Sequence, residues 1–261
     1  MMDILETVYN NLILQMKNSF ARPMYKYCLL AQPILYSIIY YMMFKNSGQD
    51  NFMSFVILGT GILSLWSCIC FSSAGDIERE RFMGTLQVIF NTPTSFKVIM
   101  FGKILGNTIL GLFPFVISYL SVKIFFHGNV YIKEPLYFLI SMILIIISFM
   151  GISLIFSSFF TLSRSARVLM NCIEYPIFIL CGVIFPIEIL PKWTIPFSYI
   201  LSPTWASKLL RMCLDGISDK GEFYRCMGIL IGITCIYFVL SYILYNIIDK
   251  RTRINATLEV S

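Results

Sequence analysis

Residues 76–95, DIERERFMGTLQVIFNTPTS, form a short polar stretch between two long apolar runs, and the rest of the chain is arranged around it. The stretch opens on a group of charges and continues into an amphipathic piece with Leu86, Ile89 and Phe90 at helical spacing, before Pro93 prevents further helix. This pattern predicts a short amphipathic helix between two membrane spans that presents charged groups to the water phase. A solvated loop with a capping helix is equally compatible with the composition.

The composition places the chain in a membrane. Of its 261 residues 57% are hydrophobic and only 13% are charged, and the mean hydropathy is +0.77. Soluble domains carry about a quarter charged residues, so this chain lacks the polar surface that a soluble domain needs. The net charge of +6 comes from lysines and arginines that flank apolar runs instead of clustering. We therefore assign the basic excess to membrane topology and expect no nucleic-acid partner.

The apolar runs predict the topology. A helix needs about 20 apolar residues to cross a bilayer. The sequence predicts one all-α membrane domain with six transmembrane helices, at residues 27–44, 52–74, 98–126, 136–160, 168–187 and 227–248. An even number of spans places both termini on one side. Most lysines and arginines of the short segments fall on the side that holds the termini and residues 76–95, so we expect that side to be the cytoplasm and the membrane to be the plasma membrane.

Two further patterns concern helix packing. In residues 1–22, Leu5, Val8, Leu12 and Met16 recur at three- and four-residue steps with polar residues opposite, which predicts an amphipathic helix lying in the membrane interface against lipid. Pairs of glycines four residues apart occur in the third span, at 102 and 106, and in the sixth, at 228 and 232. Such pairs let helix backbones approach closely, but glycine is common in membrane helices, so a specific role stays open.

The fifth predicted span carries an ionisable group. Asn171 and Glu174 lie three residues apart and therefore share a helix face, with Arg167 one turn earlier. A charge within a membrane is costly and usually faces the interior of the helix bundle, where it finds a partner. Glu174 is expected either to line a translocation path or to form an ion pair with Arg164, Arg167 or Arg81, and that pair is either a lock on the closed state or purely structural.

The segment that follows the fifth span is neither a span nor an ordinary loop. Residues 187–211 contain repeated prolines together with aromatic residues typical of a membrane interface. The combination predicts short helices that dip back into the outer leaflet, because irregular backbone at membrane depth survives only when it is buried in protein or lines a cavity.

Two motifs resemble those of one protein family, the ABC-2 type permeases, which are membrane subunits of ATP-driven exporters. The charges followed by Gly84-Thr85-Leu86, the Thr-Pro-x-Ser of residues 92–95 and Gly102-Lys103 resemble the family's first cytoplasmic loop. The resemblance implies that this loop, residues 76–95, carries a coupling helix seated in a cleft of the ATPase subunit. Usual members have Glu where this chain has Gln87, which puts one charge contact in doubt.

The second motif lies in the outer segment. Gly182, Phe185 and Pro186, then Leu190-Pro191-x-Trp193, and finally Pro203-Thr204-Trp205 resemble the family's path from the fifth span into a re-entrant pair of helices. The resemblance therefore covers nearly the whole chain. It implies ATPase-coupling residues Asp76, Glu78, Arg79, Glu80, Arg81, Gly84, Thr85 and Pro93. It also implies a translocation path or gate at Asn171, Glu174, Gly182, Phe185, Pro186, Pro191, Trp193, Pro203 and Trp205.

The sequence contains none of the usual signs of catalysis. No Gly-x-x-x-x-Gly-Lys-[Ser/Thr] phosphate loop is present, so this chain does not hydrolyse ATP by that route. Metal-ligand spacing and a nucleophile–base pair are also missing. Most of the 8 cysteines fall in apolar runs, and Cys213 and Cys226 are expected to remain thiols. We expect no catalytic residue, no metal and no cofactor in this chain.

The resemblance completes the functional expectation. It implies a non-enzymatic permease subunit that pairs with a second copy of itself or a paralogous permease, and with ATPase subunits that bind ATP and Mg²⁺. The abundance of Phe and Tyr suits an amphipathic cargo such as a drug, a peptide or a glycan. The alternatives are a non-transporting immunity or sensor module with the same fold, and an intramembrane enzyme acting on lipid.

Overall fold

The computed structural model describes residues 4–45, 52–90, 92, 94–126, 132–162, 166–183, 190–217 and 219–255. Within these ranges the regular elements are all helices, which agrees with the predicted all-α class. They are α1 Ile4–Phe20, α2 Pro23–Lys26, the π-helical turn η1 Tyr27–Ala31, α3 Gln32–Phe44, α4 Phe52–Phe82, α5 Thr85–Phe90, α6 Phe96–Leu110, α7 Phe113–Phe126, α8 Pro135–Leu162, α9 Ala166–Leu180, α10 Ile195–Ile200, α11 Ser202–Asp215 and α12 Lys220–Asn255.

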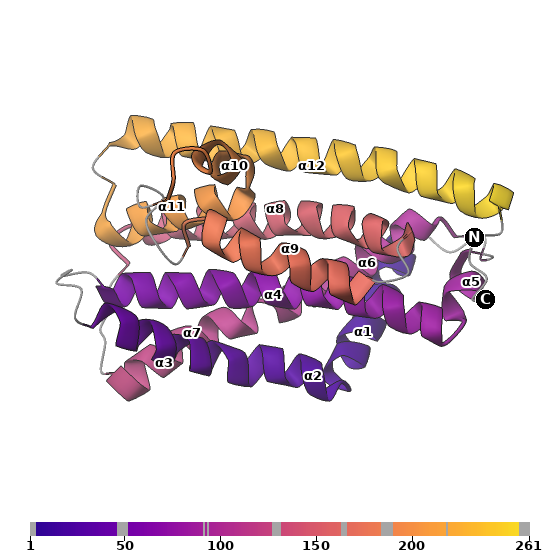
Figure 1. The fold of residues 1–261 in the computed structure, drawn as a ribbon, viewed down its shortest axis with the longest axis horizontal. Coiled ribbons are helices and arrows are strands. Elements are labelled where there is room, and N and C mark those ends of the chain that lie inside the picture. The colour runs from indigo at the N-terminus through magenta and orange to yellow at the C-terminus, as the bar shows by residue number, and fades with distance from the viewer. Residues whose placement is uncertain are drawn as a thin grey trace.

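The long helices run side by side along one axis, with α4 at the centre (Figure 1). α4 contacts α3, α6, α7, α8, α9 and α11. Trp66 of α4 is fully buried there, and Phe149 and Phe156 of α8 meet its ring edge-on at centroid distances of 5.5 and 6.1 Å. α4 is therefore the central helix of the bundle, and the helices around it pack against it.

Four helical stretches are long and apolar enough to cross a membrane: Pro23–Phe44, Phe96–Phe126, Pro135–Thr161 and Lys220–Ile248. They coincide with the predicted first, third, fourth and sixth spans. The other two predicted spans differ. α4 has a shorter apolar section, Val56–Ile69, within a 31-residue helix, and α9 has only 15 residues. The six-span topology as a whole stays a prediction.

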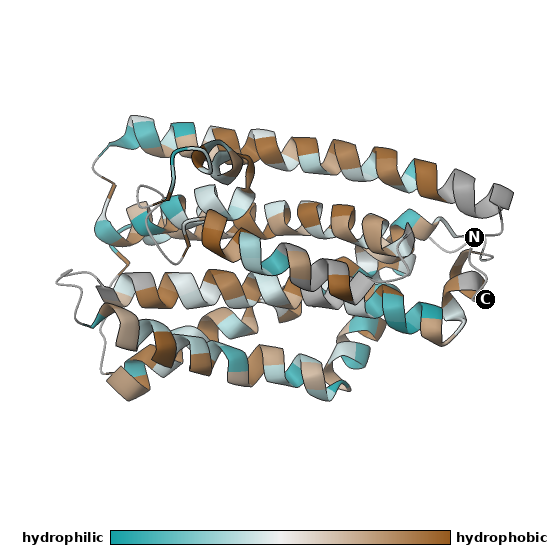
Figure 2. Ribbon diagram, in the orientation of Figure 1, coloured by the Kyte–Doolittle hydropathy of each residue, from teal (hydrophilic) through white to brown (hydrophobic). Residues whose placement is uncertain are grey.

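Hydropathy is distributed as expected for a membrane protein. Figure 2 shows hydrophobic residues along the middle of the long helices and hydrophilic residues at their ends, most clearly at the end of α4 and where α11 leads to α12. In Figure 1 the end of α4, α5 and the C-terminal end of α12 lie together at one end of the bundle, and α10 and α11 lie toward the other. We refer to these as the α5 end and the α11 end.

Two of the apolar stretches are interrupted where the sequence carries proline or glycine. The π-helical turn η1 ends at Ala31, two residues before Pro33 in the first turn of α3. A π-helical turn adds a residue to the helix and changes its direction. The third stretch breaks between α6 and α7 at Gly111, where an added Cβ would lie 3.1 Å from a methyl carbon of Leu65. The break was not anticipated, and it lets α7 pack against α4.

Candidate functional site

The charged start of the polar stretch is helical and belongs to α4. The helix continues through residues 76–82 and ends in a turn, where the amide of Met83 donates to the Arg79 carbonyl at 2.9 Å and the amide of Gly84 to the Arg81 carbonyl at 3.1 Å. Gly84 has a positive φ of 70°, a conformation that glycine adopts without strain. α5 follows at Thr85. The predicted short helix is therefore present as α5, and the charged residues before it belong to the end of the continuous helix α4.

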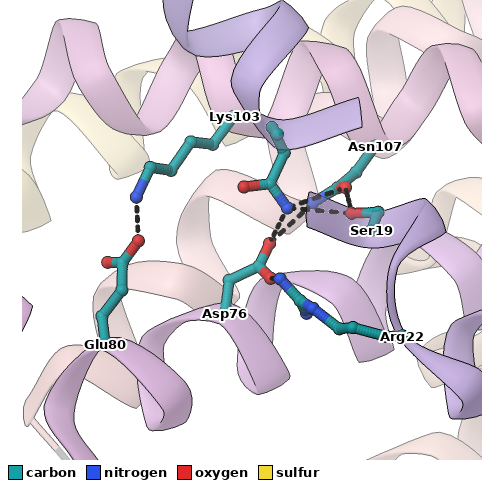
Figure 3. A network of polar contacts seen from close by, with 7 residues as sticks. Ser19, Arg22, Asp76, Glu80, Lys103 and Asn107 are labelled. Carbon is teal, nitrogen blue, oxygen red and sulfur yellow. Dashed lines mark hydrogen bonds and ion pairs between the residues drawn. The ribbon is translucent and has the colours of Figure 1, made fainter. Parts of the chain in front are cut away.

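Asp76 points inward from this end of α4 and is only 3% exposed. Its Oδ2 accepts hydrogen bonds from the side-chain amides of Gln15 at 2.6 Å and Asn107 at 2.8 Å. Its Oδ1 forms an ion pair with Arg22. Ser19 completes the network by donating to the Asn107 side-chain oxygen at 2.8 Å (Figure 3). One carboxylate thus joins α1, α4, α6 and the residue before α2.

A second ion pair lies one turn further along α4. Glu80 pairs with Lys103 of α6, and both side chains are largely buried, at 15% and 9% exposed. Because Asp76 and Glu80 are four residues apart, they lie on the same face of α4 and both hold α6. The two acids that were predicted to face water therefore lie inside the bundle and hold neighbouring helices to α4. We call these two buried ion pairs, Asp76–Arg22 and Glu80–Lys103, the braces.

The close approach of α1 to α6 depends on the glycine pair of α6. A Cβ added at Gly102 would lie 2.8 Å from the Val8 carbonyl oxygen, and one at Gly106 would lie 2.8 Å from that of Leu12. This pair therefore packs against the N-terminal helix. The pair in α12, Gly228 and Gly232, meets nothing within 4 Å, so the same motif has different surroundings in the two helices.

α1 buries polar residues and exposes apolar ones, the reverse of an amphipathic helix on a soluble protein. Its polar residues Gln15 and Ser19 are buried against α4 and α6, whereas Leu5, Tyr9 and Leu14 are exposed. An exposed apolar face is stable when it lies in lipid. The exposed apolar residues agree with an interfacial helix, but Val8 and Leu12 of the predicted lipid face lie beside Gly102 and Gly106 of α6. The sequence pattern does not indicate that the polar residues of α1 contact the bundle.

The remaining charges of the stretch differ in position. The Arg81 guanidinium donates to the carbonyls of Phe160 and Thr161 at 3.2 and 2.6 Å, at the C-terminal end of α8, where backbone carbonyls lack helical donors. Arg79 is exposed and Glu78 is half-buried. Thr85 donates its hydroxyl to the Glu80 carbonyl at 3.2 Å, which ties α5 back to α4.

The surface where α4 leads into α5 is apolar. Phe82 is 91% exposed, and Met83 and Val88 are also exposed, whereas Leu86 is buried. The prediction that this stretch presents charged groups to the water phase is therefore wrong at its tip. Much of the charge contacts the helix bundle, and the outermost side chains are hydrophobic. Pro93, the last predicted coupling residue, lies outside the described residues. We call Phe82, Met83 and Val88 the apolar tip.

Glu174 lies in the bundle interior, as predicted, and is 5% exposed. Its carboxylate accepts a 2.6 Å hydrogen bond from the Ser67 hydroxyl of α4. The predicted arginine partner is not seen among the described residues. Arg164 lies outside them, as do the side chains of Asn171 and Arg167.

The α11 end is closed by two short helices, α10 and α11, within and beyond the segment predicted to be re-entrant. Gly182, at φ 62°, follows α9, and Arg211 of α11 donates to the Gly182 and Val183 carbonyls at 3.3 and 3.0 Å. Trp205 donates to the Tyr199 carbonyl at 2.8 Å and so ties α11 to α10. The segment is therefore fixed to the end of α9.

The other predicted gate residues occupy varied positions. Trp193 is 73% exposed, Pro191 accepts the Thr194 hydroxyl on its carbonyl at 2.7 Å, and Pro203 lies in the first turn of α11. Phe185 and Pro186 lie outside the described residues. The structure thus groups Gly182, Pro203 and Trp205 around α11 and leaves Trp193 on the surface.

Other polar groups at the α11 end have a structural character. Lys208 and Glu222 form an exposed pair at 2.6 Å between α11 and α12, and this hydrogen bond raises the pKa of Lys208. Cys213 and Cys226 are free thiols, as expected, and burial raises the pKa of Cys213. In the part of the chain that the structure describes, no three His, Cys, Asp or Glu residues are grouped as a metal site requires.

Comparison with known proteins gives the same family as the motifs do. A sequence model described as the ABC-2 type transporter matches residues 8–214, from α1 through α11. The chain belongs to the ABC-2 transporter family. Members are generally non-catalytic membrane subunits. No curated protein matches the chain.

Of the polar network, the sequence predicts only Asp76 and Glu80 as site residues. The other members are Gln15, Ser19, Arg22, Lys103 and Asn107. Lys103 and Asn107 are polar residues one turn apart inside an apolar run, and a polar residue within a predicted span usually has a partner in the bundle. That signal was available. Their partners could not have been chosen from sequence, because they lie far away along the chain.

Proposed function

We propose that this ABC-2 permease is the membrane-spanning subunit of an ATP-driven exporter, with six spans and both termini in the cytoplasm, and that it moves an amphipathic cargo across the plasma membrane. The observation that carries the proposal is the apolar tip. Phe82, Met83 and Val88 leave a large hydrophobic surface exposed beyond the charged end of α4. Exposed apolar patches rimmed by polar residues mark sites of protein interaction, and the cytoplasmic ATPase is the partner that the family would supply.

The braces explain how force on the tip would reach the membrane. α4 is one continuous helix from Ser67 to Phe82, a rise of roughly 22 Å. Asp76 and Glu80 hold α1 and α6 to it, and Arg81 holds the end of α8. A displacement of the tip would therefore move four helices as one body instead of bending a loop.

In this proposal the chain supplies no catalytic group. ATP and Mg²⁺ bind to the partner ATPase, and closure of two ATPase subunits pushes the apolar tip. A second copy of the chain, or a paralogous permease, forms the other half of the pathway. The segment of α10 and α11 acts as the outer gate, because Arg211 links it to the end of α9, the helix that carries Glu174.

The docking surface is tested by purifying the full chain from its native cells and identifying the soluble proteins that come with it. A protein bearing a phosphate loop is expected. Phe82→Asp should abolish its recovery, because a charge in an apolar interface is desolvated without a partner. The matched control Phe82→Leu keeps the side chain apolar and should retain the partner.

The opposite result would favour the non-transporting module. If no ATPase is recovered with the wild-type chain under gentle cross-linking, the exporter has no motor. If an ATPase is recovered equally with Phe82→Asp, the apolar tip is not its docking surface.

A further inference from the structure

Three helices bring polar side chains together deep in the bundle. Glu174 of α9 and Ser67 of α4 are both buried, and Gln32 of α3 donates from its amide nitrogen to the Ser67 hydroxyl at 3.4 Å. Ser67 lies nine residues before Asp76 on the same helix, which is roughly 14 Å along its axis. The cluster therefore lies further along the bundle from the α5 end than the Asp76 network does.

The direction of the hydrogen bonds follows from the chemistry of the groups. Ser67 donates its single hydroxyl hydrogen to a carboxylate oxygen of Glu174 at 2.6 Å. Gln32 must then donate to Ser67, and its second amide hydrogen goes to the Tyr36 hydroxyl at 3.0 Å. The Gln32 side-chain oxygen is consequently left buried, with no hydrogen-bond partner in the described structure.

Among the described residues, the cluster therefore has more acceptors than donors. Glu174 brings two carboxylate oxygens but receives one hydrogen bond from a described residue, and the Gln32 oxygen receives none. A buried carboxylate is stabilised by a positive partner, and the contact of Glu174 within the described residues is a neutral hydroxyl. A protonated amine would add a positive charge and up to three N–H donors to those that the described residues provide.

The backbone of α9 is interrupted beside Glu174. Pro176 lies inside α9, and because proline has no amide hydrogen, the Cys172 carbonyl loses its intrahelical donor. Helices bend most readily at such positions. A bend of α9 two residues from Glu174 would change the position of the carboxylate relative to Ser67.

We propose that Glu174, with Ser67 and Gln32, forms a binding site for a protonated amine, and that the cargo is therefore a cationic amphiphile. The assignment of the bound amine as transported cargo rests on the proposed transport function. The site itself belongs to this chain alone and can be measured without an ATPase.

The test is equilibrium binding of dansylcadaverine, a fluorescent primary amine, to the purified full chain in lipid nanodiscs. Its N-acetylated derivative has the same fluorophore but neither the charge nor the ammonium donors. Saturable binding of the amine is expected, with affinity about tenfold or more above that of the acetylated probe. Glu174→Gln should remove this preference. The matched control Glu222→Gln makes the same change at an exposed site and should keep it.

Glu174→Gln is expected to fold, because a neutral amide costs less to bury than a carboxylate. Ser67→Ala provides a second variant that retains the charge, and it should also retain the preference for the amine. Equal binding of the two probes to the wild-type chain would overturn the proposal, and so would an unchanged preference in a folded Glu174→Gln variant.

These outcomes separate the site from the transport function. If the exporter proposal is wrong, no ATPase is recovered with the chain, but the chain still prefers the amine over the acetylated probe. Failure of the amine site appears as equal binding of both probes in a chain that still recovers its ATPase.

Discussion

The substitution Asp76→Asn probes the braced end of α4 with the smallest possible change in shape. Asp76 accepts two hydrogen bonds and pairs with Arg22. Asparagine keeps one acceptor oxygen but turns an NH₂ group toward donors or toward the guanidinium, so at least one interaction becomes repulsive and Arg22 loses its counter-charge.

The magnitude follows from how far the pair is buried. Removing one partner of a fully buried ion pair costs about 3–5 kcal/mol. The Asp76 side chain is 3% exposed, but that of Arg22 is 20% exposed and retains some water. We therefore expect a loss of about 2–3 kcal/mol in the free energy of unfolding. The matched control is Glu222→Gln, whose pair with Lys208 is about half exposed and should cost less than about 1 kcal/mol.

The assay is reversible unfolding of the purified chain in mixed detergent micelles, extended to a double-mutant cycle with Arg22→Gln. Because the two side chains are in contact, their effects should not add, and a coupling energy of about 1–2 kcal/mol is expected. Additive effects, or a loss in Asp76→Asn no larger than in Glu222→Gln, would refute the view that this carboxylate braces the bundle.

Two further substitutions test the packing around the proposed moving parts. Gly102→Val should displace α1 and lower the free energy of unfolding by about 1–3 kcal/mol, because its Cβ would lie 2.8 Å from the Val8 carbonyl. Increased trypsin cleavage at Lys17 reports the displacement, and Gly228→Val, with open space around it, is the control that should leave cleavage unchanged. Gly182→Ala should cost about 1–2 kcal/mol because alanine strains a left-handed backbone, here at φ 62°. If melting temperatures of Gly182→Ala and Gly232→Ala coincide, the turn at Gly182 is not strained by a side chain.

The helices could be predicted from sequence because a membrane imposes one simple requirement, length and apolarity, on each span. The stretches ending at Phe44 and Phe126 were located to within a few residues for this reason. α9 is shorter than expected because Gly182 ends the helix early with a positive φ. A glycine in sequence does not reveal which backbone conformation it will take.

The site was predicted less completely, because charge patterns do not state which way a side chain points. The six residues 76–81 have the composition of a solvated helix, and nothing local distinguishes Asp76 from the exposed Arg79. The partners of Asp76 come from positions 15, 22 and 107, so its burial is a property of the assembled bundle. The apolar tip could not be predicted for the same reason. Phe82 and Leu86 belong to one helical apolar pattern, and nothing in that pattern indicates that Leu86 is buried and Phe82 exposed.

The most direct measurement is photo-cross-linking from the apolar tip in native cells. Phe82 is replaced by benzoylphenylalanine, which keeps an aromatic ring at the 91% exposed position, and the cross-linked products are identified by mass spectrometry. A permease coupled to a motor should yield one dominant product, a soluble protein that carries a phosphate loop. Products with lipid alone, or with no ATPase while the chain remains folded in the membrane, would contradict the proposal that this tip receives the ATPase.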